Sequence, residues 1–419
     1  MLNFLLPCPS KLATRANRLS PPKAALAVGL CGCLALSTAT AHAEHDKIRL
    51  GAARYVSPEE GLLISALHGW EDGNSALAQT NLDSLLLLAP KFGVAKSLRA
   101  AIRENPDPQD IGVYQAFMSQ SVGEASKTEF EQRWNYLLDP ASNEVKPKNL
   151  LQLSESQAHA IMVDLSRNRL YIFKNEAGQP RLIADFYAGI GSAGIGKEVE
   201  GDKKTPVGVY FVTSELLDDE LDELYGVGAF PINYPNALDR MAERTGNGIW
   251  LHGVPRNTWT RAPQSSRGCV TMANRDFQRL KNKVDVRKTP VILSESIEWL
   301  DEAPTDTTKE LLAAINQWVA DWESIDTQRY LANYREDFIG QGMDLAQWSE
   351  HKTRVNSRKT EINVDLSDIS LLQDPATDIV VATFTQHYVS NNFSSVDRKR
   401  LYWQRDSNGD WKILLENGV

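Results

Sequence analysis

The segments IWLHG (residues 249–253) and SSRGCV (residues 265–270) decide what fold and chemistry this chain is expected to have. The first is a short apolar strand that ends in a histidine, and the second is a polar turn that ends in a cysteine. His252 and Cys269 are seventeen residues apart, so a histidine at a strand end can meet a cysteine on the following loop. An imidazole that withdraws the thiol proton creates a thiolate, which is the reactive nucleophile.

The glycines beside these two residues fit the same chemistry. Gly268 allows a backbone conformation in which amide N–H groups point at a developing oxyanion, and losing one such donor typically costs about 10²–10³ in rate. No Asp or Asn close to His252 in the sequence is an evident partner for its ring, so the carbonyl of Gly253 is a candidate for orienting it. The pattern predicts a Cys–His dyad.

The first 43 residues have the pattern of a secretory signal peptide. They carry four basic residues and no acidic residue, an apolar run over Ala24–Leu36, and the small-residue site Ala41-His42-Ala43. This order predicts export to the periplasm with cleavage after Ala43, and the apolar run is short for a bilayer span. An uncleaved membrane anchor, or a lipoprotein modified in the segment Leu30–Cys33, are the alternatives.

The number of cysteines supports a chemical role for Cys269. The chain has four, and Cys8, Cys31 and Cys33 all lie in the predicted signal peptide. A mature exported protein would keep Cys269 alone, whereas exported proteins normally pair their cysteines or avoid them. A buried, inert cysteine is the alternative.

Changes of pattern along the chain predict an α+β multidomain protein. Apolar residues at helical spacing predict an N-terminal helical domain with a polar linker over residues 44–150. Short β-type runs then predict a mostly antiparallel catalytic domain over residues 151–300, with a hairpin at Ser166-Arg167-Asn168. The acidic run Asp218–Glu223 is expected to be a helix face or a flexible lid.

Residues 304–419 are expected to form an accessory domain. An amphipathic helix is predicted over Thr307–Trp322, helical structure over Tyr330–Phe338, and alternating strands after residue 360. Asn408-Gly409 predicts a hairpin between the last two strands. This order resembles the nuclear-transport-factor-two-like (NTF2-like) cone fold, which often has a pocket, so the domain is expected to help bind glycan or stem peptide.

Two sequence blocks resemble the YkuD family of L,D-transpeptidases over residues 158–297. One is His-Gly followed by Ser-x-Gly-Cys-Val, and the other is GDKKTPVGVY at residues 201–210, with its Thr-Pro-x-Gly turn. The resemblance implies that Cys269 is the nucleophile and His252 the general base, that the Gly253 carbonyl holds the histidine, and that the Gly268 and Cys269 amides form the oxyanion hole.

Arg267 marks a departure from many family members, which carry a second histidine before Gly-Cys. The chain is similar to the Ser-Arg-Gly-Cys subset with a C-terminal cone domain, which includes L,D-carboxypeptidases that determine cell shape in helical bacteria. The subset also resembles enzymes that detach proteins from peptidoglycan. Arg267 is expected to bind a substrate carboxylate in a bidentate way.

Further residues are candidates for substrate binding, with weaker support. Ser266, which belongs to the Ser-x-Gly-Cys motif, is a candidate for contacting substrate. Tyr234 and Trp259 are expected either to line the cleft or to pack in the core. A set of basic residues is expected either to face the acidic stem peptide or to be solvated: Lys197, Lys203, Lys204, Arg256 and Arg261. The remaining histidines have no metal-ligand spacing, and the dyad needs neither metal nor cofactor.

The sequence therefore predicts an enzyme that acts on peptidoglycan stem peptides in cell-wall remodelling. The formal net charge of −9 disfavours nucleic acid as a partner. The protein is expected to contact the membrane only through the signal peptide. The helical domain is a candidate for recruiting envelope proteins. A catalytically inactive binding scaffold, an amidase that releases proteins from peptidoglycan, and a thiol redox sensor are the alternatives.

Overall fold

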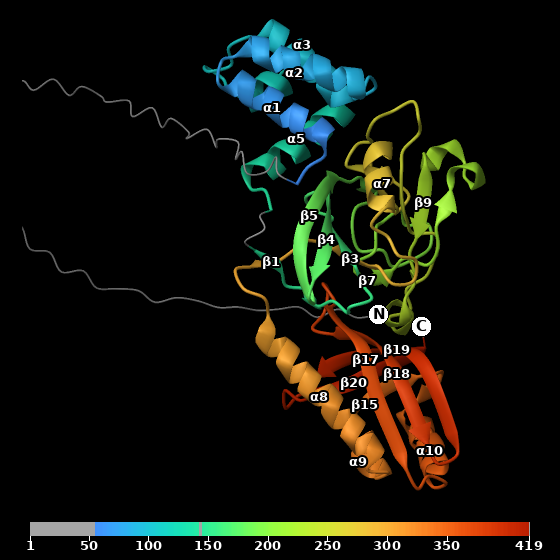
Figure 1. Cartoon of the computed structure of the whole chain (residues 1–419). Coiled ribbons are helices and arrows are strands. Elements are labelled where there is room, and N and C mark those ends of the chain that lie inside the picture. Colours follow the sequence, from blue (N-terminus) through green and yellow to red (C-terminus); the bar gives the residue numbers. More distant parts are fainter. Residues whose placement is uncertain (1–54, 142–144, 419) are drawn as a thin grey trace, which may run out of the picture. The chain divides into compact units, whose positions relative to one another are not determined.

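The structure is a computed structural model that describes residues 55–141 and 145–418. The predicted signal peptide and its three cysteines lie outside the described residues. The described chain has an N-terminal helical region, a central, mostly β region and a C-terminal region of sheet and helices, so the α+β multidomain prediction is confirmed (Figure 1). Of the helices in these ranges, none is both long and apolar enough to cross a bilayer.

The helical region forms because five short helices each bury one face in a shared core. Their bounds are α1 (Pro58–Glu71), α2 (Ser75–Leu88), α3 (Gly93–Glu104), α4 (Val113–Met118) and α5 (Glu124–Leu138). Ser57 caps α1 by accepting a hydrogen bond from the Glu60 N–H, and Pro58 occupies the first turn, where no donor is needed. Trp70 and Phe130 are fully buried in the core.

A five-stranded sheet with the order β5-β4-β3-β13-β7 forms the base of the central region. Its strands are β3 (His159–Asp164), β4 (Arg169–Glu176), β5 (Gln179–Tyr187), β7 (Gly208–Phe211) and β13 (Pro290–Ser294). The predicted hairpin joins β3 to β4, with Asn168 in the left-handed region at φ 53°. β13 runs parallel to β3, which makes this sheet mixed.

A second, smaller sheet with the order β12-β10-β9-β8 carries the candidate site. The elements around it are β6 (Ile190–Gly191), β8 (Leu216–Leu217), β9 (Gly228–Pro231), α6 (Ala237–Met241), β10 (Trp250–His252), β11 (Gln264–Ser266), β12 (Val270–Thr271) and α7 (Asn274–Lys281). The acidic run Asp218–Glu223 is not an α-helix face. It contributes to two short 3₁₀ turns, η2 (Asp218–Glu220) and η3 (Glu223–Tyr225).

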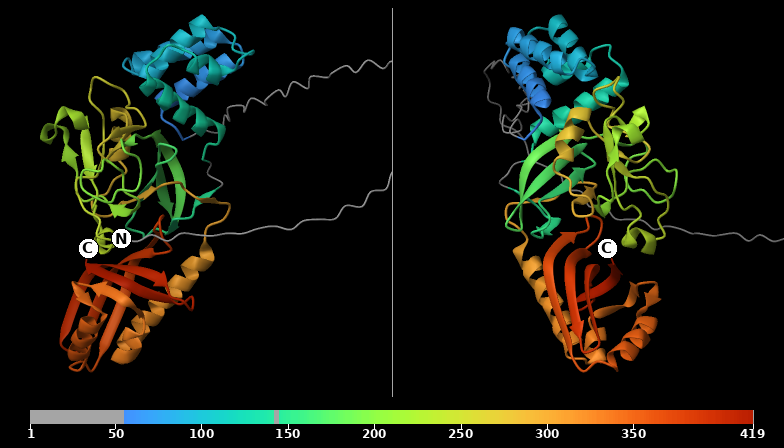
Figure 2. Two further views of the ribbon diagram at one scale, coloured as in Figure 1. Left: turned by 180° about the vertical axis from the view of Figure 1, so that it is seen from behind. Right: turned by 45° about the vertical axis from the view of Figure 1, so that its right-hand side comes forward.

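The C-terminal region is a seven-stranded sheet with the order β16-β15-β20-β19-β18-β17-β2, and Figures 1 and 2 show α8 alongside it. Its elements are β2 (Leu150–Gln152), α8 (Thr305–Glu323), α9 (Thr327–Leu331), β15 (Tyr334–Gly340), β16 (Met343–Asp344), α10 (Leu345–Asn356), β17 (Ile362–Gln373), β18 (Val380–Ser390), β19 (Phe393–Arg405) and β20 (Trp411–Gly418). Large aromatic side chains such as Trp318, Phe384 and Trp403 fill its core.

Two features of this region differ from the sequence prediction. The helix expected over Tyr330–Phe338 is wrong, because α9 ends at Leu331 and β15 begins at Tyr334. Tyr334 and Phe338 are four residues apart. Side chains at this spacing share a face both in a helix and in a strand, so the spacing does not distinguish the two. Strand β2 pairs with β17 and is therefore part of the C-terminal sheet, although residues from 151 onward were expected to belong to the catalytic region. A short ladder of β1 (Lys146–Pro147) with β14 (Trp299–Leu300) lies near this join.

A buried ionic cluster joins the helical region to the central sheet. Glu60 on α1 accepts hydrogen bonds from Arg133 on α5 at 2.8 Å and from Arg169 on β4 at 2.7 Å. Arg133 also pairs with Glu129, and Arg169 pairs with Asp185 on β5. All five side chains are buried. Because each charge has a partner of opposite sign, the cluster can exist without water.

Candidate active site

His252 ends strand β10 of the small sheet, and Cys269 directly precedes its neighbour β12. β10 and β12 pair in parallel, with Leu251 opposite Val270 and His252 opposite Thr271. Cys269 directly precedes Val270, so it lies one strand across and two residues back from His252. Side chains two residues apart along a strand share a face. Continued back from Thr271 to Cys269, this alternation predicts the thiol on the same face as the imidazole, which is the arrangement that a Cys–His dyad needs.

The His252 ring is fixed by its own neighbour. Its Nδ1 lies 2.6 Å from the carbonyl oxygen of Gly253, and the side chain is buried. A carbonyl oxygen only accepts hydrogen bonds, so Nδ1 carries the hydrogen and Nε2 remains the basic nitrogen. Burial, with a smaller contribution from the charge of Arg261, lowers the pKa of His252 to about 4, although the hydrogen bond to Gly253 opposes the shift.

The Cys269 thiol is enclosed, with 9% of the residue exposed. Its Sγ donates to the carbonyl oxygen of Gly248 over 3.4 Å. Burial raises the pKa of the thiol to about 11, and the backbone N–H of Trp250 and the positive charge of Arg261 reduce this shift. At neutral pH, the resting site therefore holds a neutral thiol next to a neutral imidazole.

Ser266 stabilises the loop that carries Cys269. Its hydroxyl donates to the carbonyl of Cys269 at 2.6 Å and accepts from the N–H of Gly268 at 3.0 Å. This buried side chain is therefore occupied within the protein, and it does not fit the substrate contact predicted for it. The Gly268 N–H, predicted as one oxyanion donor, is likewise engaged by Ser266 in this structure.

The loop is also packed too tightly for a side chain at Gly268. This residue has φ +119°, and a Cβ there would lie 2.7 Å from the carbonyl oxygen of Lys204. Both the conformation and the close approach require glycine. The Thr-Pro turn and the Cys turn, separate in the sequence, are therefore in direct contact, as expected if both blocks serve one site.

The remaining residues predicted to bind substrate are in different environments. Arg267 is exposed, two residues before Cys269, and among the described residues no acidic side chain forms an ion pair with it. Lys204 is half-buried in the Thr-Pro turn. Tyr234 is buried, its hydroxyl donates to the Thr245 carbonyl at 3.1 Å, and burial raises its pKa to about 12. Arg267 and Lys204 thus stay candidates, while Tyr234 packs internally.

Trp259 does not face the candidate site. Its ring packs against Phe92 of the helical region, with centroids 6.1 Å apart, and it joins the core of that region. The loop that carries Trp259 has further contacts there: Thr260 donates to Glu129 at 2.7 Å, and the Arg256 carbonyl accepts from Lys91 at 2.9 Å. The helical region thus supports the loop that leads to Cys269.

Lys197, expected either to face substrate or to be solvated, is buried. Its Nζ donates to Asp202 at 2.7 Å and to the carbonyl of Val199 at 3.0 Å. Burial opposes ionisation of Asp202, but the Lys197 ammonium and three backbone N–H groups outweigh it and lower the pKa of Asp202 to about 2. The pair holds the 197–204 turn together.

Two residues that support His252 have no recognisable pattern in the sequence. The ring of Tyr225 lies edge-on to the His252 ring, with centroids 5.0 Å apart. Asn274 accepts from the Val254 N–H at 3.0 Å and donates to the Val254 carbonyl at 2.8 Å, which fixes the turn after Gly253. Both contacts arise from distant segments. In the described part of the chain, no three His, Cys, Asp or Glu side chains gather as metal ligands.

Two segments match known domain families. Residues 158–293 match the L,D-transpeptidase catalytic domain of the YkuD family, and residues 310–417 match the NTF2-like domain found at the C-terminus of Cds6. The first match contains both His252 and Cys269. The second contains most of the C-terminal sheet.

Solved structures of two bacterial proteins share this fold. Bd1075 from Bdellovibrio bacteriovorus is 28% identical, with a TM-score of 0.58, over 66% of this chain and 98% of that chain. The helical cell shape determining protein Pgp2 from Campylobacter jejuni is 29% identical, with a TM-score of 0.57, over 65% of this chain and 95% of that chain. Among curated proteins, none matches this chain.

Proposed function

We propose that this protein, which contains a YkuD L,D-transpeptidase catalytic domain followed by an NTF2-like domain, acts on the tetrapeptide stem of peptidoglycan through a thioester on Cys269. The observation that carries the proposal is the parallel pairing of β10, which ends at His252, with β12, which Cys269 directly precedes, together with the bond of His252 Nδ1 to the Gly253 carbonyl. This leaves Nε2 as the base for the thiol proton.

The reaction begins when His252 Nε2 takes the proton of the Cys269 thiol and the sulfur attacks the carbonyl carbon at the L-centre of diaminopimelate. The carbonyl oxygen becomes an oxyanion, for which the Cys269 N–H is the assigned donor. The C–N bond then breaks, and the terminal D-Ala leaves with the proton from His252. A thioester remains, and water or an amine attacks it to release the acyl group.

The resting protonation states make this transfer dependent on substrate. A thiol with a pKa of about 11 and an imidazole with a pKa of about 4 hold the proton on sulfur. When a bound substrate offers a carbonyl carbon for attack, the sulfur forms a bond to that carbon as it loses its proton. A free thiolate therefore does not need to accumulate. Arg267, exposed next to Cys269, supplies a guanidinium for a substrate carboxylate.

The acceptor decides the biological outcome. Water gives a trimmed tripeptide, a diaminopimelate amine gives a cross-link, and hydrolysis at a protein linkage releases an attached protein. The similar protein Pgp2 is a helical cell shape determining protein, so we favour trimming of stem peptides in the control of cell shape. The signal peptide predicted over residues 1–43 would deliver the enzyme to the periplasm, and N-terminal sequencing of the mature protein tests this.

Muropeptide analysis by mass spectrometry tests the chemistry. Purified protein incubated with tetrapeptide muropeptides is expected to yield tripeptides, while Cys269→Ser is expected to yield none. Ser265→Ala is the matched control, because it changes a hydroxyl in the same loop and leaves the dyad intact. Full activity of Cys269→Ser would refute the assignment. Failure of the unmodified protein to form a thioester with a carbapenem, which acylates the nucleophile in this family, would favour an inactive binding scaffold.

A further inference from the structure

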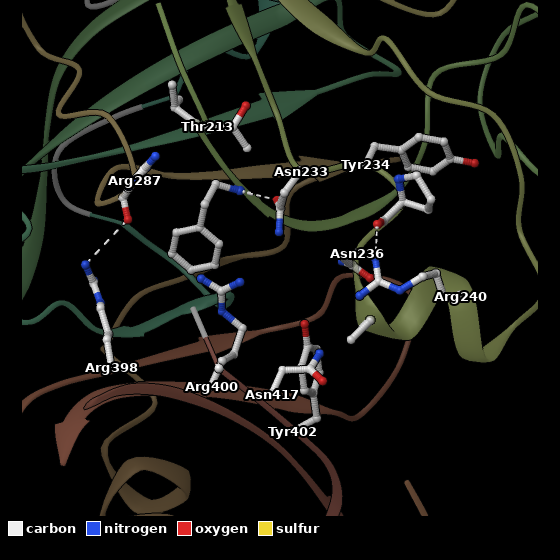
Figure 3. A pocket seen from close by; sticks show the side chains of 15 residues that line it. Thr213, Asn233, Tyr234, Asn236, Arg240, Arg287, Arg398, Arg400, Tyr402 and Asn417 are labelled. Carbon is white, nitrogen blue, oxygen red and sulfur yellow. Dashed lines mark hydrogen bonds between the residues drawn. The ribbon is translucent and has the colours of Figure 1, made fainter. Parts of the chain in front are cut away.

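A cavity of about 620 Å³ lies between the central region and the C-terminal sheet, outside the candidate active site. Figure 3 shows side chains that reach it from both regions. Residues 211–213 and 233–237 with Arg240 and Arg287 form one wall, and β19 with the end of β20 forms the other. Neither Cys269 nor His252 lines it. Its volume is within the range of about 300–1,000 Å³ that is common for small-ligand sites.

The lining of this cavity is strongly basic. Four arginines contribute to it from three segments, and no Asp or Glu does: Arg240, Arg287, Arg398 and Arg400. The bonds that hold these side chains go to uncharged acceptors. Arg240 donates to the Pro235 carbonyl at 2.6 Å, and Arg398 donates to the Arg287 carbonyl at 3.4 Å. The cavity therefore concentrates positive charge that carboxylates of the described chain do not neutralise.

Arg400 is the most informative of the four because it is buried, with 8% of the residue exposed. Its guanidinium lies over the Phe211 ring, 3.8 Å from the centroid, and its Nε donates to the Thr383 hydroxyl at 3.3 Å. The Tyr402 hydroxyl is its other polar neighbour. A buried guanidinium without a carboxylate is unfavourable, and a bound anion would remove that cost.

The strand pattern separates this cavity from the interior of the C-terminal sheet. Arg398, Arg400 and Tyr402 alternate along β19 and share the face that lines the cavity. Lys399 points to the opposite face, where it pairs with Glu416 at 3.0 Å. The arginine face is thus available to a ligand that lies between the two regions, and it is not consumed by the sheet's own ion pair.

We propose that this cavity is a second binding site for a peptidoglycan stem peptide, whose carboxylates are held by Arg400 and Arg398. Planar guanidinium groups match carboxylates in pairs of parallel hydrogen bonds. Arginines on both walls suit an extended ligand with several carboxylates better than one small inorganic anion. The choice of ligand rests on the proposed function, since that function brings such peptides to the protein. A peptide held here would keep the catalytic region on the wall between turnovers.

The test uses the full chain with Cys269→Ser, so that the peptide is not consumed. The probes are N-acetylmuramyl-tetrapeptide, the same peptide with its carboxylates amidated, and inorganic phosphate. Calorimetry measures affinity, and hydrogen exchange locates binding. The free-acid peptide is expected to slow exchange in residues 232–241 and 398–402, and the amidated peptide is not. Protection by phosphate without protection by the peptide would overturn the proposal.

Variants of the cavity arginines distinguish binding there from binding at the active site. Arg400→Met keeps a long side chain against Phe211, and it is expected to weaken binding at the cavity by about ten- to a hundredfold. Arg398→Gln changes a half-buried residue and serves as a second variant that is expected to retain the fold. Arg181→Gln is a control outside the cavity. Unchanged protection of 398–402 in both cavity variants would contradict the proposal.

The two proposals fail in distinguishable ways. If the unmodified protein did not cleave the tetrapeptide but the peptide still slowed hydrogen exchange in residues 398–402, the proposed function would be wrong and the cavity site would stand. Cleavage with no protection of 398–402 would remove the cavity site and leave the enzyme.

Discussion

The Thr205 hydroxyl donates a hydrogen bond of 3.0 Å to the carbonyl oxygen of Gly268. The same hydroxyl accepts from the N–H of Gly191 at 2.9 Å. One side chain thus joins three segments that are separate in the sequence, directly before Cys269, the proposed nucleophile. The Thr-Pro turn fixes the backbone from which the thiol projects.

Replacing Thr205 by valine is expected to lower both stability and activity. The change keeps the shape but leaves the buried Gly191 N–H without its acceptor, at a cost of about 1–3 kcal/mol in the free energy of unfolding. Urea unfolding and kcat/KM for tetrapeptide cleavage measure the two effects. Thr213→Val is the control, because its exposed hydroxyl also donates to a carbonyl, that of Pro231. Equal behaviour of the two variants would show that Thr205 has no special role.

The sequence suggests the proposed dyad because its pattern is local. His252 ends an apolar strand, and Cys269 follows a glycine turn, so both could be proposed without a structure. The contacts of Tyr225 with His252 and of Trp259 with the helical region depend on pairings between distant segments. Lys197 shows the same limit, since nothing near a lysine in the sequence tells a buried ion pair from a solvated side chain.

The reactivity of Cys269 toward iodoacetamide is expected to rise steadily with pH. Burial raises the pKa of its thiol to about 11, and only the thiolate reacts. Between pH 6 and pH 10 the rate should rise by about tenfold per pH unit without a plateau. In urea, the unfolded chain should reach a plateau above about pH 8.5. A plateau in the folded protein already near pH 6 would instead indicate a preformed thiolate–imidazolium pair.

The buried His252 is expected to make the protein less stable in acid. Its folded pKa is about 4, below the unfolded value of 6.5, so between these values the unfolded state binds the additional proton. Stability contributed by the neutral ring is complete above pH 6.5 and falls as the pH drops, by about 3 kcal/mol at pH 4.

Urea unfolding at pH 7 and at pH 4.5 measures this dependence. His252→Gln has no titratable ring, so its loss of stability in acid should be smaller than that of the unmodified protein. Other groups titrate in both proteins and cancel in the comparison. The same loss in both would mean that the pKa of His252 is the same in the folded protein as in the unfolded chain.

Arg267→Gln is expected to weaken substrate binding without affecting the fold. The side chain is exposed, so the free energy of unfolding should stay within about 0.5 kcal/mol. Loss of a charge-assisted contact to a substrate carboxylate should raise KM by about tenfold or more, with kcat little changed. Arg267→Lys should recover only part of the loss, because a lysine cannot bind in a bidentate way. A fall in kcat with unchanged KM would contradict this role.

The buried cluster around Glu60 gives a prediction about the helical region. Burial opposes ionisation of Glu60, but Arg169 and Arg133 outweigh it and lower the pKa of its carboxyl. Glu60→Gln leaves two buried guanidinium groups short of a negative partner, which should cost about 3–5 kcal/mol. Glu298→Gln, which removes an exposed pair with Lys148, should cost less than about 1 kcal/mol.

Activity provides a second measurement for the same variant, below its unfolding transition. Arg133 of the cluster holds Glu129, and Glu129 accepts the hydrogen bond of Thr260, on the loop that leads to Cys269. A loosened cluster should therefore reduce kcat/KM for tetrapeptide cleavage even in protein that remains folded. If Glu60→Gln were destabilised but fully active when folded, the helical region would stabilise the fold without positioning the loop that carries the nucleophile.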